Sequence, residues 1–175
     1  MKKSVWLWEL AGLTFTAILG TLLHFIYEWT GSLGIAPFSA VNESTWEHMK
    51  ILFFPMLIFA LVQYLFFNKE YADFWCIKFA GIVFGVLLVP VLFYTYNGAF
   101  GKSPAWLNVI FFFLSAGGAY LLETCLFKRD GKPCQWSVLA IVLLFVLALA
   151  FILFTFLTPR VPLFLDPVKG TYGLG

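Results

Sequence analysis

The chain has 175 residues, of which 62% are hydrophobic and only 11% are charged. A soluble domain carries about 25% charged residues, so this composition cannot build a surface that faces water on all sides. The net charge is only +2, and the basic residues are scattered through the predicted loops, which argues against nucleic-acid binding.

Five apolar stretches, taken in chain order, predict an all-α integral membrane bundle. A helix needs about 20 mostly apolar residues to cross a bilayer. The stretches lie at about 5–29, 46–67, 72–96, 104–127 and 136–158, and an outer tail follows at 159–175. None of them shows the alternation of a β-barrel strand. We therefore predict a single membrane domain, residues 1–175, whose main partner is the lipid bilayer.

Basic residues favour one orientation of these helices, because short loops rich in Lys and Arg stay in the cytoplasm. With the N-terminus inside, the inner segments hold Lys2, Lys3, Lys69, Lys128, Arg129 and Lys132. The outer segments then hold Lys50, Lys102, Arg160 and Lys169. The bias predicts an N-terminus inside and a C-terminus outside.

The three cysteines would all lie on the inner side in this topology. Thiols stay reduced in a cytoplasm, and no CxxC spacing links Cys76, Cys125 and Cys134. We expect them to be unpaired and to serve as small apolar filler.

Small residues predict which helices pack closely. Gly81 and Gly85 form a GxxxG pattern in the third stretch, and residues 116–119 form a patch of alanine and glycine in the fourth. Small residues let helix backbones approach each other in lipid. We expect the third and fourth helices to pack together.

The scarce polar side chains gather at the predicted outer end of the first two helices. His24 and Glu28 are four residues apart and share one helix face. The segment VNESTWEHMKILFFP, residues 41–55, places Glu43, Glu47 and His48 immediately before the second apolar run. A short loop joins the two helices, so we expect antiparallel neighbours and converging side chains.

This end of the bundle supplies the candidate ligand-binding residues. They are His24, Glu28, Asn42, Glu43, Trp46, Glu47, His48, Tyr94 and Asn97. Five of them carry donors suited to Zn²⁺ or Fe²⁺, and the candidate metal ligands are His24, Glu28, Glu43, Glu47 and His48. A divalent metal held there could activate water.

Other interpretations of the same residues stay open. Ser44 and Glu47 match a capping box, which would make the cluster only the polar start of a helix. A polar pocket without metal, or a path for protons or cations, uses the same side chains. Glu123, near the inner end of the fourth helix, is expected to form a structural ion pair with Lys128 or Lys78.

The segments HFIYEWTG, VNESTWEHMKILFFP and TYGLG resemble a family of small bacterial multi-pass membrane proteins of unknown function. The resemblance spans nearly the whole chain, and NESTWEH is its most specific element. It implies a location in the bacterial cytoplasmic membrane, and it implies no reaction, ligand or catalytic residue.

The leading functional hypothesis is an outward-facing His/Glu pocket that binds a small ligand or ion. One alternative is a membrane-embedded enzyme, dependent on a metal or on acid/base groups, that acts on a lipid-like substrate. Others are a transporter or channel subunit, which would form a homo-oligomer, and a structural scaffold. The outer tail is expected either to fold over the pocket as a lid or to be an ordinary terminus.

Overall fold

The computed structural model of the chain describes residues 4–67, 70–129 and 134–174. The helices are α1 (Val5–Thr30), α2 (Thr45–Phe67), α3 (Phe74–Phe100), α4 (Ala105–Phe127), α5 (Ser137–Phe156) and the short 3₁₀ helix η1 (Pro162–Phe164). The prediction of an all-α bundle with five long helices is confirmed. Each of the five is long and apolar enough to cross a membrane.

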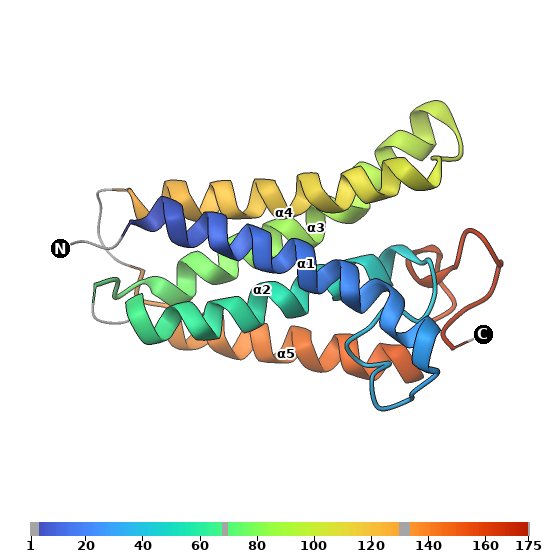
Figure 1. Cartoon of the computed structure of the whole chain (residues 1–175), viewed down its shortest axis with the longest axis horizontal. Coiled ribbons are helices and arrows are strands. Elements are labelled where there is room, and N and C mark those ends of the chain that lie inside the picture. The colour runs from blue at the N-terminus through green and yellow to red at the C-terminus, as the bar shows by residue number, and fades with distance from the viewer. Residues whose placement is uncertain (1–3, 68–69, 130–133, 175) are drawn as a thin grey trace.

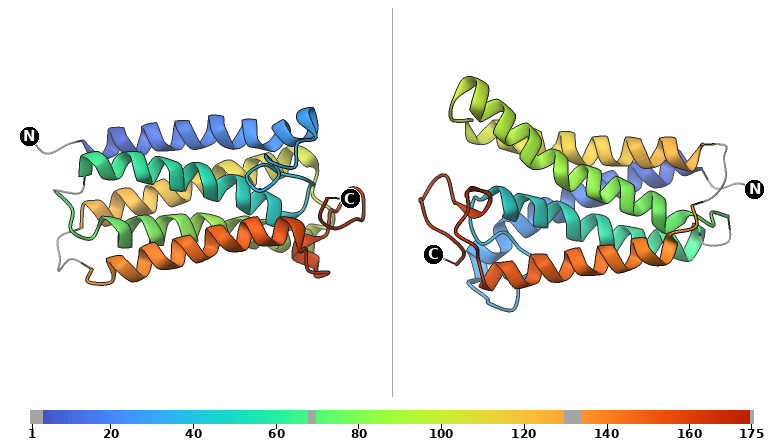
Figure 2. Two further views of the ribbon diagram at one scale, coloured as in Figure 1. Left: turned by 90° about the horizontal axis from the view of Figure 1, so that it is seen from below. Right: turned by 180° about the vertical axis from the view of Figure 1, so that it is seen from behind.

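The long helices lie roughly along one axis, and successive helices run in opposite directions (Figure 1). We call one end of the bundle the tail end, because the α1–α2 loop, the α3–α4 turn and the tail after α5 all lie there. The opposite end, where α1, α3 and α5 begin, is called the N-terminal end. Figure 2 shows the same arrangement from two further sides.

Helix α2 lies at the centre and contacts all four other long helices. Most of its residues from Thr45 to Ala60 are buried, whereas α5 buries only four of its residues. Large apolar side chains point outward from every long helix, for example Ile18, Leu65, Leu87, Leu114 and Val138. This distribution suits a bundle solvated by lipid, and it defines a multi-pass membrane protein.

Helices α3 and α4 pack closely along their small residues, as the sequence predicts. A Cβ added to Gly85 would lie 2.9 Å from the Ala119 Cβ and 3.2 Å from the Ser115 carbonyl oxygen. At Gly81, an added Cβ would collide with the carboxyl of Glu123. The glycines therefore allow contact between α3 and α4, and at Gly81 they make room for an acidic side chain.

The prediction that all cysteines are unpaired is wrong. Cys76, at the start of α3, forms a disulfide with Cys134, while Cys125 is free. The two partners are 58 residues apart, and only the return of the chain between α4 and α5 brings them together. The bond lies at the N-terminal end, and disulfides persist in oxidising compartments, so it opposes the placement of that end in the cytoplasm.

The tail folds back across the tail end of the bundle. Leu165 pairs with Tyr172 in an antiparallel bridge, and the Asp166 backbone N–H donates to the Thr171 carbonyl at 2.9 Å. The Asn42 side chain then donates to the Gly173 carbonyl at 2.8 Å. Of the two expectations for the tail, the structure therefore supports the folded cover.

Candidate metal centre

His24 projects from α1 at a point where the hydrogen-bond ladder of the helix is interrupted. The Ser39 hydroxyl donates to the Leu23 carbonyl, and it accepts a bond from the Tyr27 N–H at 3.1 Å. The Ala40 N–H donates to the same Leu23 carbonyl at 3.0 Å. A side chain inserted into the ladder is a recognised cause of helix bending. Ser39 thus fixes the α1–α2 loop against the turn that carries His24.

Glu43 and His48 are positioned by the start of α2. The Asn42 side-chain oxygen accepts a bond from the Ser44 N–H at 2.8 Å, and the Ser44 hydroxyl accepts one from the Glu47 N–H at 3.4 Å. These bonds cap the helix in the way that Asn and Ser favour. The Glu43 N–H donates to Asp166 of the tail at 3.4 Å. The tail therefore helps the capping bonds to hold the segment that carries Glu43.

The ring of His48 is held by a hydrogen bond to the backbone. Its Nδ1 lies 2.9 Å from the Ser44 carbonyl oxygen, which can only accept, so Nδ1 carries the proton. This leaves Nε2 as the nitrogen that faces Glu43 and that could bind a metal ion. Metal-binding histidines commonly donate their other nitrogen to a carbonyl in this way.

Three side chains converge into one group of possible ligands. His24 Nε2 lies 3.6 Å from Glu43 Oε1, and His48 Nε2 lies 3.7 Å from Glu43 Oε2. One donor atom from each of these residues lies within 4.8 Å of the others. Ligands bound to a tetrahedral Zn²⁺ at about 2.0–2.2 Å are roughly 3.4 Å apart, so the two contacts of Glu43 are close to that spacing, and the three donors together form a possible metal-binding cluster.

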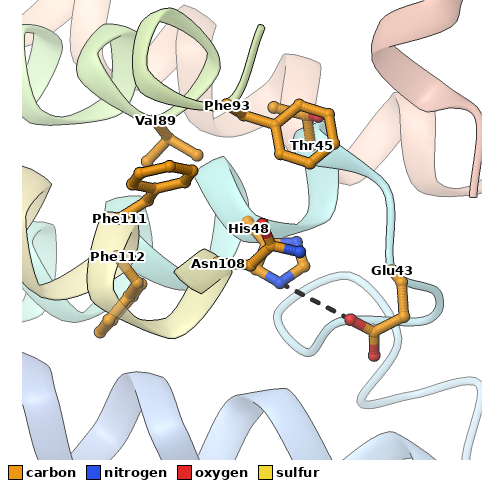
Figure 3. Close-up of a pocket in the computed structure, with 8 residues that line it drawn as sticks. All are labelled: Glu43, Thr45, His48, Val89, Phe93, Asn108, Phe111 and Phe112. Carbon is orange, nitrogen blue, oxygen red and sulfur yellow. Dashed lines mark ion pairs between the residues drawn. The ribbon is translucent and has the colours of Figure 1, made fainter. Parts of the chain in front are cut away.

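The cluster faces a cleft of about 990 Å³ between the bundle and the tail. Its walls include Phe93 and Asn97 of α3, Asn108 of α4, and Pro167 and Val168 of the tail. Figure 3 shows a smaller pocket that adjoins the cleft, in which His48 lies beside Asn108, Glu43 approaches from the loop, and Val89, Phe93, Phe111 and Phe112 form an apolar wall. Donors from two helices and a loop thus share an accessible chamber.

The Glu47 side chain does not join the group of possible ligands. Its carboxylate is 3% exposed, forms an ion pair with Lys50 at 2.5 Å and accepts a bond from the Val41 N–H at 3.1 Å. Lys50 also donates to the Ala36 carbonyl and the Thr155 hydroxyl, each at 2.9 Å. Glu47 therefore lies outside the ligand group, in a buried pair that ties α2 to the loop and to α5.

The other candidate residues occupy different places. Glu28 is exposed at the end of α1 and is not part of the three-residue group. Trp46 is buried against Phe151 and Phe164 of the core. Tyr94 and Asn97 line the cleft, where Asn97 also accepts a bond from the Ser103 N–H at 2.7 Å.

Three contributors to this site are absent from the predicted ligand-binding residues. They are Ser39, Asn108 and Asp166. Asn108 and Asp166 are rare polar residues in an apolar chain, which is the signal that could have singled them out. Ser39 carried no such signal, because loop serines are common and its role depends on which turn of α1 it meets.

The fold and the site define a multi-pass helical membrane protein with a polar cleft and a cluster of possible metal ligands. A family model described as "Family of unknown function (DUF6512)" matches residues 1–174, and the chain belongs to that family. Comparison with curated proteins and with solved structures gives no match.

Proposed function

We propose that the chain binds one divalent transition metal ion, Zn²⁺ or Fe²⁺, through His24, Glu43 and His48. The observation that carries the proposal is the convergence of two imidazoles and a carboxylate, whose donor atoms lie within 4.8 Å of one another. Two histidines and one glutamate form a common catalytic zinc set, with the fourth position open to water. That set would give the cleft a Lewis acid and a source of hydroxide near neutral pH.

Elemental analysis of the purified protein in detergent tests this proposal. We expect about one Zn²⁺ or Fe²⁺ per chain, and less than about a tenth of that in His24→Ala or His48→Ala, because each removes a ligand. Glu28→Gln is the matched control, since Glu28 lies one turn from His24 and outside the group. Metal-free protein that folds normally after growth with both metals would refute the assignment.

A second feature, an apolar groove beside the cluster, favours a lipid-like substrate at this metal site. A groove of about 240 Å³ runs between α1 and α4, lined by Gly20, Thr21, Phe25, Val109, Phe112 and Phe113 together with His24, His48 and Asn108. The last three also line the cleft, so the two spaces meet at the cluster. An amphiphile could place its polar head at the metal and its chain in the groove.

Native mass spectrometry tests the groove. The protein is first freed of bound lipid in detergent and then loaded with phosphatidylethanolamine. Val109 lines both spaces, so Val109→Trp should fill the junction and abolish retention of the lipid. Val91→Trp is the control, because Val91 is exposed to a similar extent on α3. Equal retention by the two variants would exclude the groove as the lipid site.

The setting that we propose is the bacterial cytoplasmic membrane, with the cleft facing outward. The distribution of Lys and Arg supports this orientation, and the disulfide at the N-terminal end opposes it. A phosphatase reporter joined after residue 175 should be active if the tail end faces the periplasm. An inactive phosphatase, with a fluorescent protein active at the same position, would reverse the orientation.

A further inference from the structure

A second polar cluster lies inside the bundle, away from the cleft. It joins Glu9 of α1, Gln63 of α2, Lys78 of α3 and Glu123 of α4. All four side chains are buried, with exposed fractions of 2% or less. We call these four residues the inner cluster.

The two carboxyls of the inner cluster have unequal sets of partners. Lys78 Nζ lies 3.3 Å from both oxygens of Glu9, and Gln63 Nε2 donates to Glu9 Oε1 at 2.8 Å. Glu123 Oε2 accepts from Lys78 Nζ at 2.5 Å, but Glu123 Oε1 is buried without a hydrogen-bond partner among the described residues. Both carboxyls contact the same ammonium group, because Glu9 and Glu123 each accept from Lys78 Nζ.

The surroundings of the inner cluster are apolar. The rings of Phe59, Phe74, Tyr120 and Phe127 all lie within 6 Å of Lys78 Nζ. The Tyr120 hydroxyl is engaged by the Thr16 hydroxyl at 2.8 Å. Helix α5, the remaining helix of the bundle, contains no ionisable side chain.

The charges of the inner cluster do not balance. Two carboxylates facing one ammonium leave one negative charge inside an apolar bundle, where an unpaired charge is very costly. Two carboxyls that share one site cannot both ionise easily, and the usual outcome is one retained proton. The buried Glu47–Lys50 pair, with one charge of each sign, has no such excess.

We propose that the inner cluster is a proton-binding site, in which Glu123 carries one proton and Glu9 stays a carboxylate. The proton comes from water, forms an O–H bond on Glu123 and turns its unpartnered oxygen into a donor. The cluster then holds one carboxylate and one ammonium, so its net charge is zero. Glu9 accepts from both Gln63 and Lys78, whereas Glu123 accepts from Lys78 alone and has one oxygen without a partner among the described residues, so the proposal places the proton on Glu123.

Infrared spectroscopy of the full chain in lipid tests the proposal directly. A protonated carboxyl has a carbonyl stretch where carboxylates do not absorb. At neutral pH we expect this band in the wild type and its loss in Glu123→Gln, while Glu47→Gln, which alters the balanced pair, retains it. A spectrum without a protonated carboxyl, or with a band that survives in Glu123→Gln, would overturn the assignment.

Thermal unfolding gives a second readout that remains useful if one variant folds poorly. A neutral amide imitates a protonated carboxyl, so Glu123→Gln should shift the unfolding midpoint much less than Glu9→Gln, which removes the ionised partner of Lys78. Equal or reversed shifts would contradict the proposal. A midpoint of the wild type that rises with Na⁺, but not with K⁺ at equal ionic strength, would assign the excess charge to a bound sodium ion instead and overturn the proton site.

Discussion

The cleft at the tail end and the inner cluster contain similar side chains in opposite surroundings. In the cleft, the side chains of His24, Glu43 and His48 are 23%, 45% and 15% exposed, and no lysine or arginine pairs with them among the described residues. The inner cluster is closed, and Lys78 lies between its two carboxyls. The first region can recruit an ion from water, whereas the second must neutralise its charge internally.

This difference shows how burial decides the use of a polar group in a membrane protein. A carboxylate at an open rim keeps part of its hydration and costs little to leave without a fixed partner. A carboxylate inside the bundle requires a cation, a proton or both. Glu47, buried beside the cleft, follows the second rule through its pair with Lys50.

The largest expected effect comes from Lys78→Met, which would leave the inner cluster without its cation. Removing one partner of a buried pair costs about 3–5 kcal/mol. We expect little folded protein after extraction, as measured by size-exclusion chromatography and thermal unfolding. Lys169→Met, which removes an exposed lysine of the tail, should behave as the wild type. A stable Lys78→Met protein would refute the internal neutralisation of this cluster.

Lys50→Met sharpens the comparison between a balanced pair and an unbalanced cluster. It leaves the buried Glu47 carboxylate without its cation and should also lower the free energy of unfolding by about 3–5 kcal/mol. The double variant Glu47→Leu/Lys50→Met should recover more than half of that loss, because apolar replacements of a buried pair are often tolerated. Glu123→Gln should not rescue Lys78→Met, because Glu9 stays charged. If Glu123→Gln restored the stability of Lys78→Met, the inner cluster would behave as a balanced pair, like Glu47 and Lys50.

Gly81→Ala should have a moderate effect. The added methyl group would displace the Glu123 carboxyl, and such overpacking costs about 1–3 kcal/mol. Gly117→Ala is the control, because nothing lies within 4 Å of its added Cβ, and it should be neutral or stabilising by up to about 1 kcal/mol. Thermal unfolding of the two variants side by side measures the difference, and equal midpoints would contradict the close approach at Gly81.

Ser39→Ala should have the smallest effect on stability and a clear effect on metal binding. It leaves the Tyr27 N–H without its acceptor, at a cost of about 1 kcal/mol. Because Ser39 fixes the turn that carries His24, metal affinity should fall about 10–100-fold, as for other residues that support ligands. Ser32→Ala in the same loop is the control. Isothermal titration with Zn²⁺ measures both, and unchanged affinity in Ser39→Ala would separate Ser39 from the metal centre.

The sequence predicted part of the candidate site. Polarity and helical spacing indicated His24, Glu43 and His48, because polar groups at a helix end are few and loop length restricts where they lie. Glu28 and Glu47 had the same signals, yet Glu28 is exposed and Glu47 pairs with Lys50. Which carboxylate meets which partner depends on the rotation of each helix about its axis, and composition does not encode that rotation.

Lys128 and Lys78 were predicted as alternative partners of Glu123, and the structure selects Lys78, whose Nζ lies 2.5 Å from Glu123 Oε2. The addition of Glu9, 69 residues from Lys78, had no local signal. The disulfide was missed for a similar reason, because Cys76 and Cys134 meet only after α4 and α5 have packed against α3.

By itself the sequence determined the solvent and the number of helices, because long apolar runs with few charges are stable only as lipid-solvated helices. Only the tertiary structure decided which of the scarce charges share a cleft and which are sealed together, because those contacts join helices that are distant in the chain. In this protein that pairing separates a set of possible metal ligands open to water from a carboxyl that we expect to hold a proton.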